Sequence, residues 1–316
     1  MAYIVYDPNI INGQTPREWL PILQQGLAPH SVAFKDDKNI DSEKVDYLVT
    51  WYLQENPLNI YPNLKAVLAM SAGVNHIVGN PYLPQSLPLV RMIDPGLTKA
   101  MEEYVLSMVL RLHIGHDFYQ ELEQEKKWGL EMVDPVLAGE RTVGFLGFGE
   151  LGQACAKRCA ETGFRVSGWS RSRKTVKGIK SYAGDEELEA FLKQNDIVVI
   201  LLPLTKETRN FMDHDKIAMM KKGSCLINVA RGPIVVDEAL LEHLDNNHID
   251  RAILDVFRKE PLPEDHPYWE HCKVTVTPHI AALTHPKTAV KHLKEVVESI
   301  QAGNHPPGLV DMDKGY

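Results

Sequence analysis

Short runs of β-branched and apolar residues alternate with longer amphipathic stretches between residues 143 and 277, and this alternation restricts the fold more than any other feature. Strands separated by helices form βαβ units, whose strands pair in parallel. Several runs are apolar at every position, as in strands that helices cover on both faces. We therefore expect an α/β fold with a doubly wound parallel sheet, the Rossmann arrangement. The predicted strands are Val143–Gly147, Phe164–Trp169, Ile179–Tyr182, Ile197–Leu202, Cys225–Ala230, Ala252–Val256 and Val274–Thr277.

The first 97 residues repeat this alternation on a smaller scale and predict a second, smaller α/β unit with a helix over Pro16–Leu27. Apolar residues from Met101 to Leu112 recur at helical spacing, which predicts a linking helix that continues toward Lys127. We expect the last helical stretch, Pro286–Ala302, to pack back on the first unit. The strands predicted in this unit are Tyr3–Tyr6, Val32–Phe34, Tyr47–Trp51, Lys65–Met70 and Leu89–Met92.

The composition excludes several classes of protein. Acidic residues outnumber basic ones, 42 to 34, and no basic run is visible, so we expect neither nucleic acid nor an anionic membrane as a partner. The longest apolar stretch, Ile197–Leu204, is far shorter than the roughly 20 residues of a membrane-spanning helix. The N-terminus has no signal-peptide pattern, which predicts a cytoplasmic protein. The four cysteines lack C-x-x-C spacing, and we expect no disulfide and no metal site.

A G-x-G-x-x-G sequence at Gly147, Gly149 and Gly152 lies between the predicted strand Val143–Gly147 and a helical stretch, Gln153–Thr162. This context is the one that a dinucleotide-binding turn requires. The first glycine permits the tight turn, the second lets the backbone approach a pyrophosphate, and the third lets helix and strand pack closely. The alternative is a tight turn without a ligand. The loop residues expected to contact the dinucleotide are Gly147, Phe148, Gly149, Glu150, Leu151 and Gly152.

The residues after the second strand of this unit indicate which dinucleotide binds. An NAD site commonly places an acidic residue about 20 positions after the glycines, whereas an arginine there accommodates the 2′-phosphate of NADP. Here Ser170 stands 18 residues after Gly152, and Arg171 and Arg173 follow it. We therefore expect NADP(H) to be preferred over NAD(H). The alternative is a solvated basic turn beside an NAD site that tolerates it.

Three charged or titratable residues, Arg231, Glu260 and His279, each follow a predicted strand. Ligands of an open parallel sheet bind outside the carboxyl ends of its strands, so these side chains should face the dinucleotide. A guanidinium can bind a carboxylate with two hydrogen bonds, and histidine is the side chain that titrates nearest neutral pH. These properties suit hydride transfer to a 2-oxo acid, with Arg231 binding the carboxylate, His279 donating the proton and Glu260 orienting the imidazole. The alternatives are a surface ion pair, an exposed loop charge and a strand-end histidine without a catalytic role.

The chain resembles the D-isomer-specific 2-hydroxyacid dehydrogenases through four motifs in order, at Gly147–Gly152, Asn228–Leu240, Leu254–Leu262 and Thr277–Ala282. The resemblance implies that Arg231, Glu260 and His279 are catalytic. It also implies that a loop at Ala72, Gly73 and Val74 offers backbone N–H groups to the substrate carboxylate, and that Trp51 walls the substrate pocket. An unliganded turn and a core tryptophan are the alternatives. Further contacts to the dinucleotide are expected from Leu202, Pro203, Thr208, Val229 and Asp255, the last of which is otherwise a loop cap.

From the residues and the resemblance together we expect NADPH-dependent reduction of glyoxylate to glycolate and of hydroxypyruvate to D-glycerate. A reductase of bulkier 2-oxo acids such as phenylpyruvate is an alternative, as is a non-enzymatic, dinucleotide-sensing corepressor. We expect a substrate-binding, flavodoxin-like domain at 1–97 and 286–316 around a dinucleotide-binding domain at 98–285. The resemblance further implies a homodimer formed through the dinucleotide-binding domain.

Overall fold

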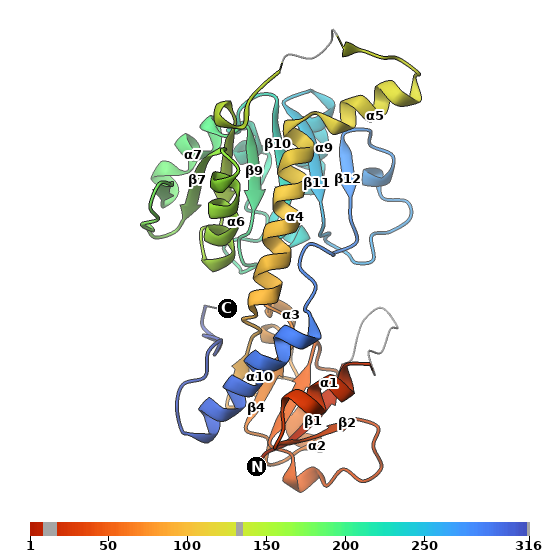
Figure 1. Ribbon diagram of the computed structural model, residues 1–316, viewed down its shortest axis with the longest axis vertical. Helices are drawn as coiled ribbons and strands as arrows, with labels where there is room; N and C mark the ends of the chain where they lie inside the picture. Colours follow the sequence, from red (N-terminus) through yellow and green to blue (C-terminus); the bar gives the residue numbers. More distant parts are fainter. Residues whose placement is uncertain (9–17, 131–134, 315–316) are drawn as a thin grey trace. The chain divides into compact units, whose positions relative to one another are not determined.

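Each predicted strand is present in the computed structural model, which describes residues 1–8, 18–130 and 135–314. The chain divides into two compact units, one formed by residues 1–97 and 283–316 and the other by residues 98–282 (Figure 1). The parallel α/β architecture expected from the alternating pattern is confirmed in both units. No helix among the described residues is both long and apolar enough to span a membrane.

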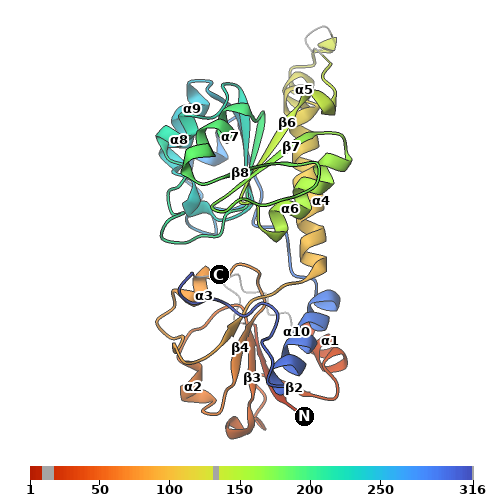
Figure 2. The same cartoon turned by 90° about the vertical axis from the view of Figure 1, so that its left-hand side faces the viewer.

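In the first unit the strands pair in parallel in the order β2-β1-β3-β4-β5, the order of flavodoxin-like sheets. Alternate residues of β3 and β4 point into two separate core layers. Helices α1 (Trp19–Gly26) and α10 (Pro286–Gln301) lie side by side against one face, although they are far apart in the sequence (Figure 2). Helices α2 (Pro57–Ile60) and α3 (Asn75–Val78) contribute to the other face. The strands are β1 (Tyr3–Asp7), β2 (Ser31–Phe34), β3 (Tyr47–Thr50), β4 (Ala66–Ala69) and β5 (Leu89–Val90).

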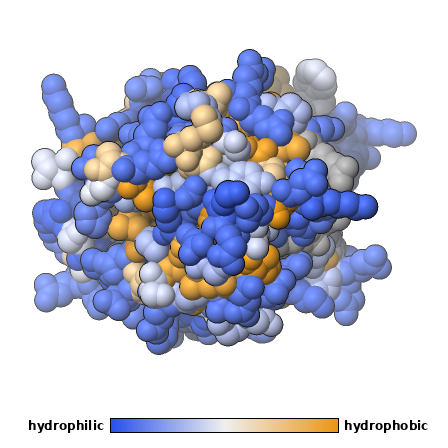
Figure 3. Space-filling model, turned by 90° about the horizontal axis from the view of Figure 1, so that it is seen from below, coloured by the Kyte–Doolittle hydropathy of each residue, from blue (hydrophilic) through white to orange (hydrophobic). Residues whose placement is uncertain are grey.

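Figure 3 views the molecule from below in Figure 1, the side on which the N-terminus lies. Hydrophilic side chains cover most of this face, and hydrophobic ones show between them in separate patches. The carboxyl ends of β1 to β4 lie on the opposite side of the first unit from this face (Figure 1).

In the second unit the strands pair in parallel in the order β12-β11-β10-β9-β6-β7-β8. The order reverses between β6 and β9, which makes their carboxyl ends the topological switch point where dinucleotides bind in such sheets. Residues Ile197–Ile200 of β9 are all buried, with alternate side chains in opposite core layers, which explains why this strand is apolar throughout. The strands are β6 (Thr142–Leu146), β7 (Arg165–Ser170), β8 (Lys180–Ala183), β9 (Ile197–Ile200), β10 (Ser224–Asn228), β11 (Ile249–Leu254) and β12 (Val274–Val276).

Helices cover both faces of this second sheet (Figure 2). Met101, Val105 and Val109 of α4 and Cys155 and Cys159 of α6 pack into one core layer. The opposite layer is covered by α7, α8 and α9. The helices of this unit are α4 (Pro95–His113), α5 (His116–Gln124), α6 (Glu150–Glu161), α7 (Leu188–Gln194), α8 (His214–Ala218) and α9 (Asp237–Asp245).

The prediction of one continuous linking helix from Met101 toward Lys127 is wrong. Helix α4 ends at His113, and α5 begins at His116. Between them Gly115 has φ of 67°, a left-handed conformation that glycine adopts at little cost and that ends many helices. At the other predicted helix, α1 begins at Trp19, and residues 16 and 17 lie outside the described residues.

Candidate active site

The glycine loop joins β6 to α6 through a tight turn, and at two of its three glycines neighbouring backbone atoms leave no room for a side chain. Gly147 has φ of 110°, and a Cβ there would lie 2.5 Å from the backbone carbon of Leu201. A Cβ on Gly152 would lie 2.0 Å from the carbonyl oxygen of Gly147. In contrast, a Cβ on Gly149 would meet no protein atom within 4 Å. The first and third glycines therefore serve the turn and the packing of the helix, whereas the second borders open space that a ligand can approach.

This open space lies at the N-terminus of α6. Gly149 is the N-cap residue of this 12-residue helix, and no side chain caps the helix there. Backbone N–H groups and the positive end of the helix dipole attract anions at such a position. Glu150 is exposed, while the side chain of Phe148 is buried against Gly168 of β7. The loop thus fits the pyrophosphate of a dinucleotide, as the sequence motif predicts.

The turn after β7 contains the basic residues expected at a 2′-phosphate. The Ser170 hydroxyl donates to the carbonyl oxygen of Ser172 at 2.8 Å. Arg173 donates through Nη1 to the carbonyl oxygen of Ser181 at 2.7 Å and through Nη2 to Glu187 at 2.6 Å. The Arg173 side chain therefore links the turn to β8 by a hydrogen bond. Arg171, two residues before Arg173, is exposed.

Two other predicted dinucleotide segments follow β9 and β10. After β9, Leu202 is buried and Pro203 is exposed. The hydroxyl of Thr208 donates to the carbonyl oxygen of Pro203 at 2.6 Å and accepts from the backbone N–H of Thr205 at 2.7 Å, which closes this loop on itself. Val229 follows β10 and is buried. The first segment follows a strand of the switch point, and the second follows the neighbouring strand β10.

The three predicted catalytic residues lie at the carboxyl ends of neighbouring strands β10, β11 and β12. His279 Nδ1 lies 2.7 Å from Glu260 Oε2, and the other oxygen of Glu260 accepts the backbone N–H of Phe257 at 2.9 Å. Burial raises the pKa of Glu260, but the hydrogen bonds from His279 and Phe257 and the charge of Arg231 outweigh it and leave that pKa below its ordinary value. The structure therefore pairs an ionised carboxylate with the imidazole.

Arg231 is brought to this pair by a close backbone contact. A Cβ on the next residue, Gly232, would lie 1.9 Å from the carbonyl carbon of Phe257, so the turn after β10 packs directly on the Glu260 loop. Burial lowers the pKa of Arg231 and the charge of Glu260 raises it, but a guanidinium stays protonated in proteins. Its Nη1 donates to the carbonyl oxygen of Ala230 at 2.7 Å.

Asn228 was not among the residues predicted for the site, yet its side chain holds the turn that carries Arg231. Its side-chain oxygen accepts the backbone N–H of Ala230, and its amide donates to the carbonyl oxygen of Arg231, both at 3.1 Å. An asparagine at a strand end, two residues before a required turn, is the signal that could have identified it.

Asp255 holds the loop that carries His279. Its carboxylate accepts the Thr277 hydroxyl at 2.6 Å and the backbone N–H groups of Ile280 and Ala281, each at 2.9 Å. Its own carbonyl oxygen accepts the N–H of His279 at 2.8 Å. Burial raises the pKa of Asp255, and the hydrogen bonds to its carboxylate oppose that effect. The structure thus places Asp255 as a cap of this loop.

The predicted substrate-contacting residues of the first unit follow β3 and β4. Ala72 and Gly73 are half-buried and Val74 is buried, and the Ser71 hydroxyl donates to the carbonyl oxygen of Gly73 at 3.0 Å. The ring of Trp51 is half-buried and packs edge-on against Trp19, with centroids 5.2 Å apart.

The described residues contain no group of three or more His, Cys, Asp or Glu side chains placed to hold a metal ion. Cys155 and Cys159 are free and buried in the core, where burial raises the pKa of both thiols. Raised thiol pKa values disfavour the reactive thiolate, so these cysteines serve as apolar core residues, as the sequence pattern suggested.

Comparisons with known proteins confirm the resemblance that the motifs indicated. The NAD-binding domain of the D-isomer-specific 2-hydroxyacid dehydrogenases matches residues 106–281. Glyoxylate/hydroxypyruvate reductase A of Serratia proteamaculans is 38% identical, with all of both chains covered. The enzyme of the same name from Yersinia enterocolitica is 36% identical over 95% of this chain and 96% of its own.

Two solved structures are similar over the whole chain. A D-isomer-specific 2-hydroxyacid dehydrogenase from Xanthobacter autotrophicus, in complex with NADPH and MES, has a TM-score of 0.93 and 36% identity, covering 100% of this chain and 99% of its own. An NADPH-dependent glyoxylate/hydroxypyruvate reductase from Sinorhizobium meliloti, in complex with NADP and sulfate, has a TM-score of 0.92 and 32% identity, covering all of both chains.

Proposed function

Because the chain belongs to the D-isomer-specific 2-hydroxyacid dehydrogenase family, we propose that it reduces small 2-oxo acids with NADPH, glyoxylate to glycolate and hydroxypyruvate to D-glycerate. The observation that carries the proposal is the 2.7 Å contact between His279 Nδ1 and Glu260 Oε2 beside Arg231, after the carboxyl ends of strands in the same parallel sheet as β6, which the glycine loop follows. This arrangement combines a permanent positive charge, a proton donor and a group that orients it.

Arg231 binds the substrate carboxylate in this proposal. A planar guanidinium can form two parallel hydrogen bonds to a carboxylate, and a buried position strengthens them because water competes less. The backbone N–H groups of Ala72, Gly73 and Val74 are the proposed second contact to the carboxylate, and Trp51 is the proposed wall of the substrate pocket. These assignments make residues 1–97 with the C-terminal segment the substrate-binding domain.

His279 donates the proton. Glu260 accepts a hydrogen bond from Nδ1, which orients the ring so that Nε2 is the nitrogen that exchanges a proton with the substrate oxygen. A bound nicotinamide dinucleotide supplies the hydride to the carbonyl carbon. As the carbonyl oxygen gains negative charge, it takes the proton from His279. Arg231 stabilises this negative charge, and Glu260 stabilises the protonated imidazole until the proton is transferred. In the reverse direction the neutral imidazole accepts the hydroxyl proton.

Steady-state oxidation of NADPH with a series of 2-oxo acids tests the substrate class. We expect the highest kcat/KM with glyoxylate or hydroxypyruvate and a steady decline as the side chain grows toward phenylpyruvate. A preference for phenylpyruvate would contradict the small-substrate proposal, and no turnover of any 2-oxo acid would contradict the reductase proposal itself.

The preference for NADP(H) is proposed from the turn at Ser170–Arg173. A carboxylate at position 170 would repel a 2′-phosphate, whereas Arg171 offers a cation beside it. Ser170→Asp should lower kcat/KM with NADPH by at least about tenfold and raise it with NADH, while the nearby exposed Lys177→Ala serves as a matched control. Equal kcat/KM of the unmodified enzyme with NADPH and NADH would contradict the preference.

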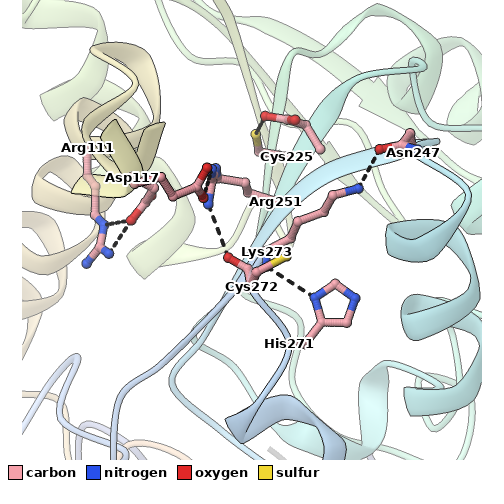
Figure 4. Close-up of polar contacts among 10 residues, drawn as sticks. Arg111, Asp117, Cys225, Asn247, Arg251, His271, Cys272 and Lys273 are labelled. Atoms are coloured by element: carbon pink, nitrogen blue, oxygen red, sulfur yellow. Dashed lines mark hydrogen bonds and ion pairs between the residues drawn. The ribbon is translucent and has the colours of Figure 1, made fainter. Parts of the chain in front are cut away.

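We also propose a homodimer formed through the second unit. Large apolar side chains are exposed among residues 114–130 and 136–137, and Trp128, Leu130 and Leu137 are 88%, 74% and 74% exposed. Exposed apolar side chains gathered on one segment mark a protein contact. Helix α5 in this region is held by two ion pairs. Asp117 pairs with Arg111 of α4 (Figure 4), and Glu121 pairs with Arg251 Nη2 of β11 at 2.7 Å.

Light scattering coupled to size-exclusion chromatography tests the dimer. Trp128→Glu combined with Leu137→Glu should convert a dimer into a monomer, because two charges would have to be buried without partners. Tyr82→Glu, an exposed residue of the first unit, is the control and should remain dimeric. A monomer before substitution, or a dimer that survives the double substitution, contradicts the proposal.

A further inference from the structure

We propose that Tyr104, on α4, is a positioning residue that holds His279 in place through Thr277 and Asp255. This inference rests on the proposed function only in assigning proton transfer to His279. Tyr104 belongs to the apolar stripe of α4, where its ring packs beside the core. Its hydroxyl, however, lies 2.6 Å from the Thr277 hydroxyl, across 173 residues of sequence.

The direction of each hydrogen bond in this chain of groups follows from the proton count. A threonine hydroxyl has one proton, and that of Thr277 is donated to Asp255 Oδ1 at 2.6 Å. The Thr277 oxygen must then accept from Tyr104, since two hydroxyl groups in contact need one donor. Burial raises the pKa of Tyr104 to about 12, so its hydroxyl keeps the proton to donate at any working pH.

The His279 loop needs this support because its backbone is strained. His279 has φ of 55°, the left-handed region that a residue with a Cβ seldom adopts. Such a conformation persists where surrounding contacts enforce it. Asp255 supplies those contacts on both sides of the histidine, to the Thr277 hydroxyl before it and to the backbone N–H groups of Ile280 and Ala281 after it.

Tyr104 fixes the orientation of the Thr277 hydroxyl, which donates its proton to Asp255. Without its hydroxyl, the Thr277 oxygen loses its donor and the Thr277 side chain can rotate away from Asp255. Asp255 Oδ1 accepts hydrogen bonds from both the Thr277 hydroxyl and the Ile280 N–H group, and loss of the first would leave its position less constrained. The left-handed backbone conformation at His279 would then be held by fewer contacts. The imidazole would sample positions away from Glu260.

The test compares Tyr104→Phe with the unmodified enzyme in NADPH-dependent reduction of glyoxylate. We expect kcat to fall about three- to tenfold, the effect of one lost hydrogen bond, while KM changes less than about twofold. We expect kcat to change more than KM because His279 acts in the transition state, whereas Arg231 also binds the substrate in the ground state. Ser107→Ala is the matched control, because its exposed hydroxyl bonds the Tyr104 carbonyl oxygen on the same helix. It should leave both constants unchanged.

A second measurement does not depend on activity. Diethyl pyrocarbonate modifies accessible imidazoles, and His279 has a side chain that is 47% exposed. Peptide mass spectrometry should show a changed rate of modification at His279 in Tyr104→Phe, with unchanged rates at other histidines. Thr277→Val should reproduce both effects, and the double variant should be no worse than the worse single variant, because the two groups act in one chain.

Three results would overturn the proposal. They are a Tyr104→Phe variant with unaltered kcat and unaltered His279 reactivity, an equal loss in Ser107→Ala, and additive effects in the double variant. If the unmodified enzyme reduces no 2-oxo acid, the proposed function fails, but the reactivity of His279 and the comparison of single and double variants still decide whether Tyr104 positions this histidine.

Discussion

Gly232 provides a direct test of how the site is assembled, because its missing side chain lets two loops touch. An added Cβ would lie 1.9 Å from the carbonyl carbon of Phe257 and 2.3 Å from both the oxygen of Phe257 and the nitrogen of Arg258. These are backbone atoms, which cannot rotate away as a side chain can. Gly232→Ala must therefore push apart the Arg231 turn and the loop that carries Glu260.

The displacement can be estimated from the contact distances. Ordinary van der Waals contact begins near 3.4 Å, so relief of a 1.9 Å contact requires a shift of about 1.5 Å, shared between the two loops. A misplacement of about 1 Å at a reacting group can cost roughly a hundredfold in rate. Overpacking of this kind also costs about 1–3 kcal/mol of stability. For a unit of this size, that loss corresponds to a decrease in Tm of about 2 to 12 °C.

The assay combines kcat/KM for glyoxylate with thermal unfolding followed by circular dichroism. We expect Gly232→Ala to lose about a hundredfold in kcat/KM and to melt at lower temperature. Gly139→Ala is the control, because an added Cβ there would meet only a carbonyl oxygen at 3.8 Å, an ordinary contact. A Gly232→Ala enzyme with unaltered kcat/KM and Tm would refute the argument that this close approach brings Arg231 to Glu260.

Gly149→Ala should show the opposite behaviour, with Tm retained and NADPH affinity lost in a fluorescence titration, because its Cβ would enter only the open space of the glycine loop. Asp196→Asn should lower the free energy of unfolding at pH 7 by about 1.5–3 kcal/mol, since that carboxylate accepts hydrogen bonds from Lys221 and Thr142 across two strands. Burial raises the pKa of Asp196, but these hydrogen-bond partners leave the pKa below the ordinary 3.8. The Asp196 carboxylate therefore stabilises the fold above pH 3.8, and this stabilisation is lost as the pH falls through the pKa of the folded state. Chemical denaturation should show that the difference in stability between Asp196→Asn and the unmodified protein shrinks below about pH 4. Because the pKa of Glu260 is likewise lowered, from an ordinary 4.5, kcat/KM for reduction should stay level from neutral pH down toward pH 5, and an acid-side decline already at pH 6 would contradict an ionised Glu260.

Much of the fold was predictable because local patterns and the geometry of parallel sheets agree. Apolar runs without alternation identified the strands of the second sheet, since such strands are buried on both faces. The strand ends then placed Arg231, Glu260 and His279 together, although 48 positions separate the first from the last. Carboxyl ends of neighbouring parallel strands meet at one edge of a sheet, so residues that follow these strands in the sequence were expected to lie close together in space.

The helix boundary at Gly115 was not predictable from the apolar stripe. Periodicity reports which face of a helix is buried, and it continues across a single glycine that changes the direction of the chain. The left-handed φ at Gly115 is a property of the folded backbone, and it starts a new helix at His116.

The sequence by itself determined the parallel sheets, the glycine loop and the kinds of side chain at the strand ends, because these depend on short-range patterns. Only the tertiary structure decided which groups hold the site together. Tyr104 belongs to an apolar helix stripe, yet its hydroxyl contacts the Thr277 hydroxyl, which donates to Asp255. Arg173 donates hydrogen bonds to Ser181 and Glu187. Hydrogen bonds between residues far apart in the sequence depend on where the packed elements bring each atom, and no local pattern contains that information.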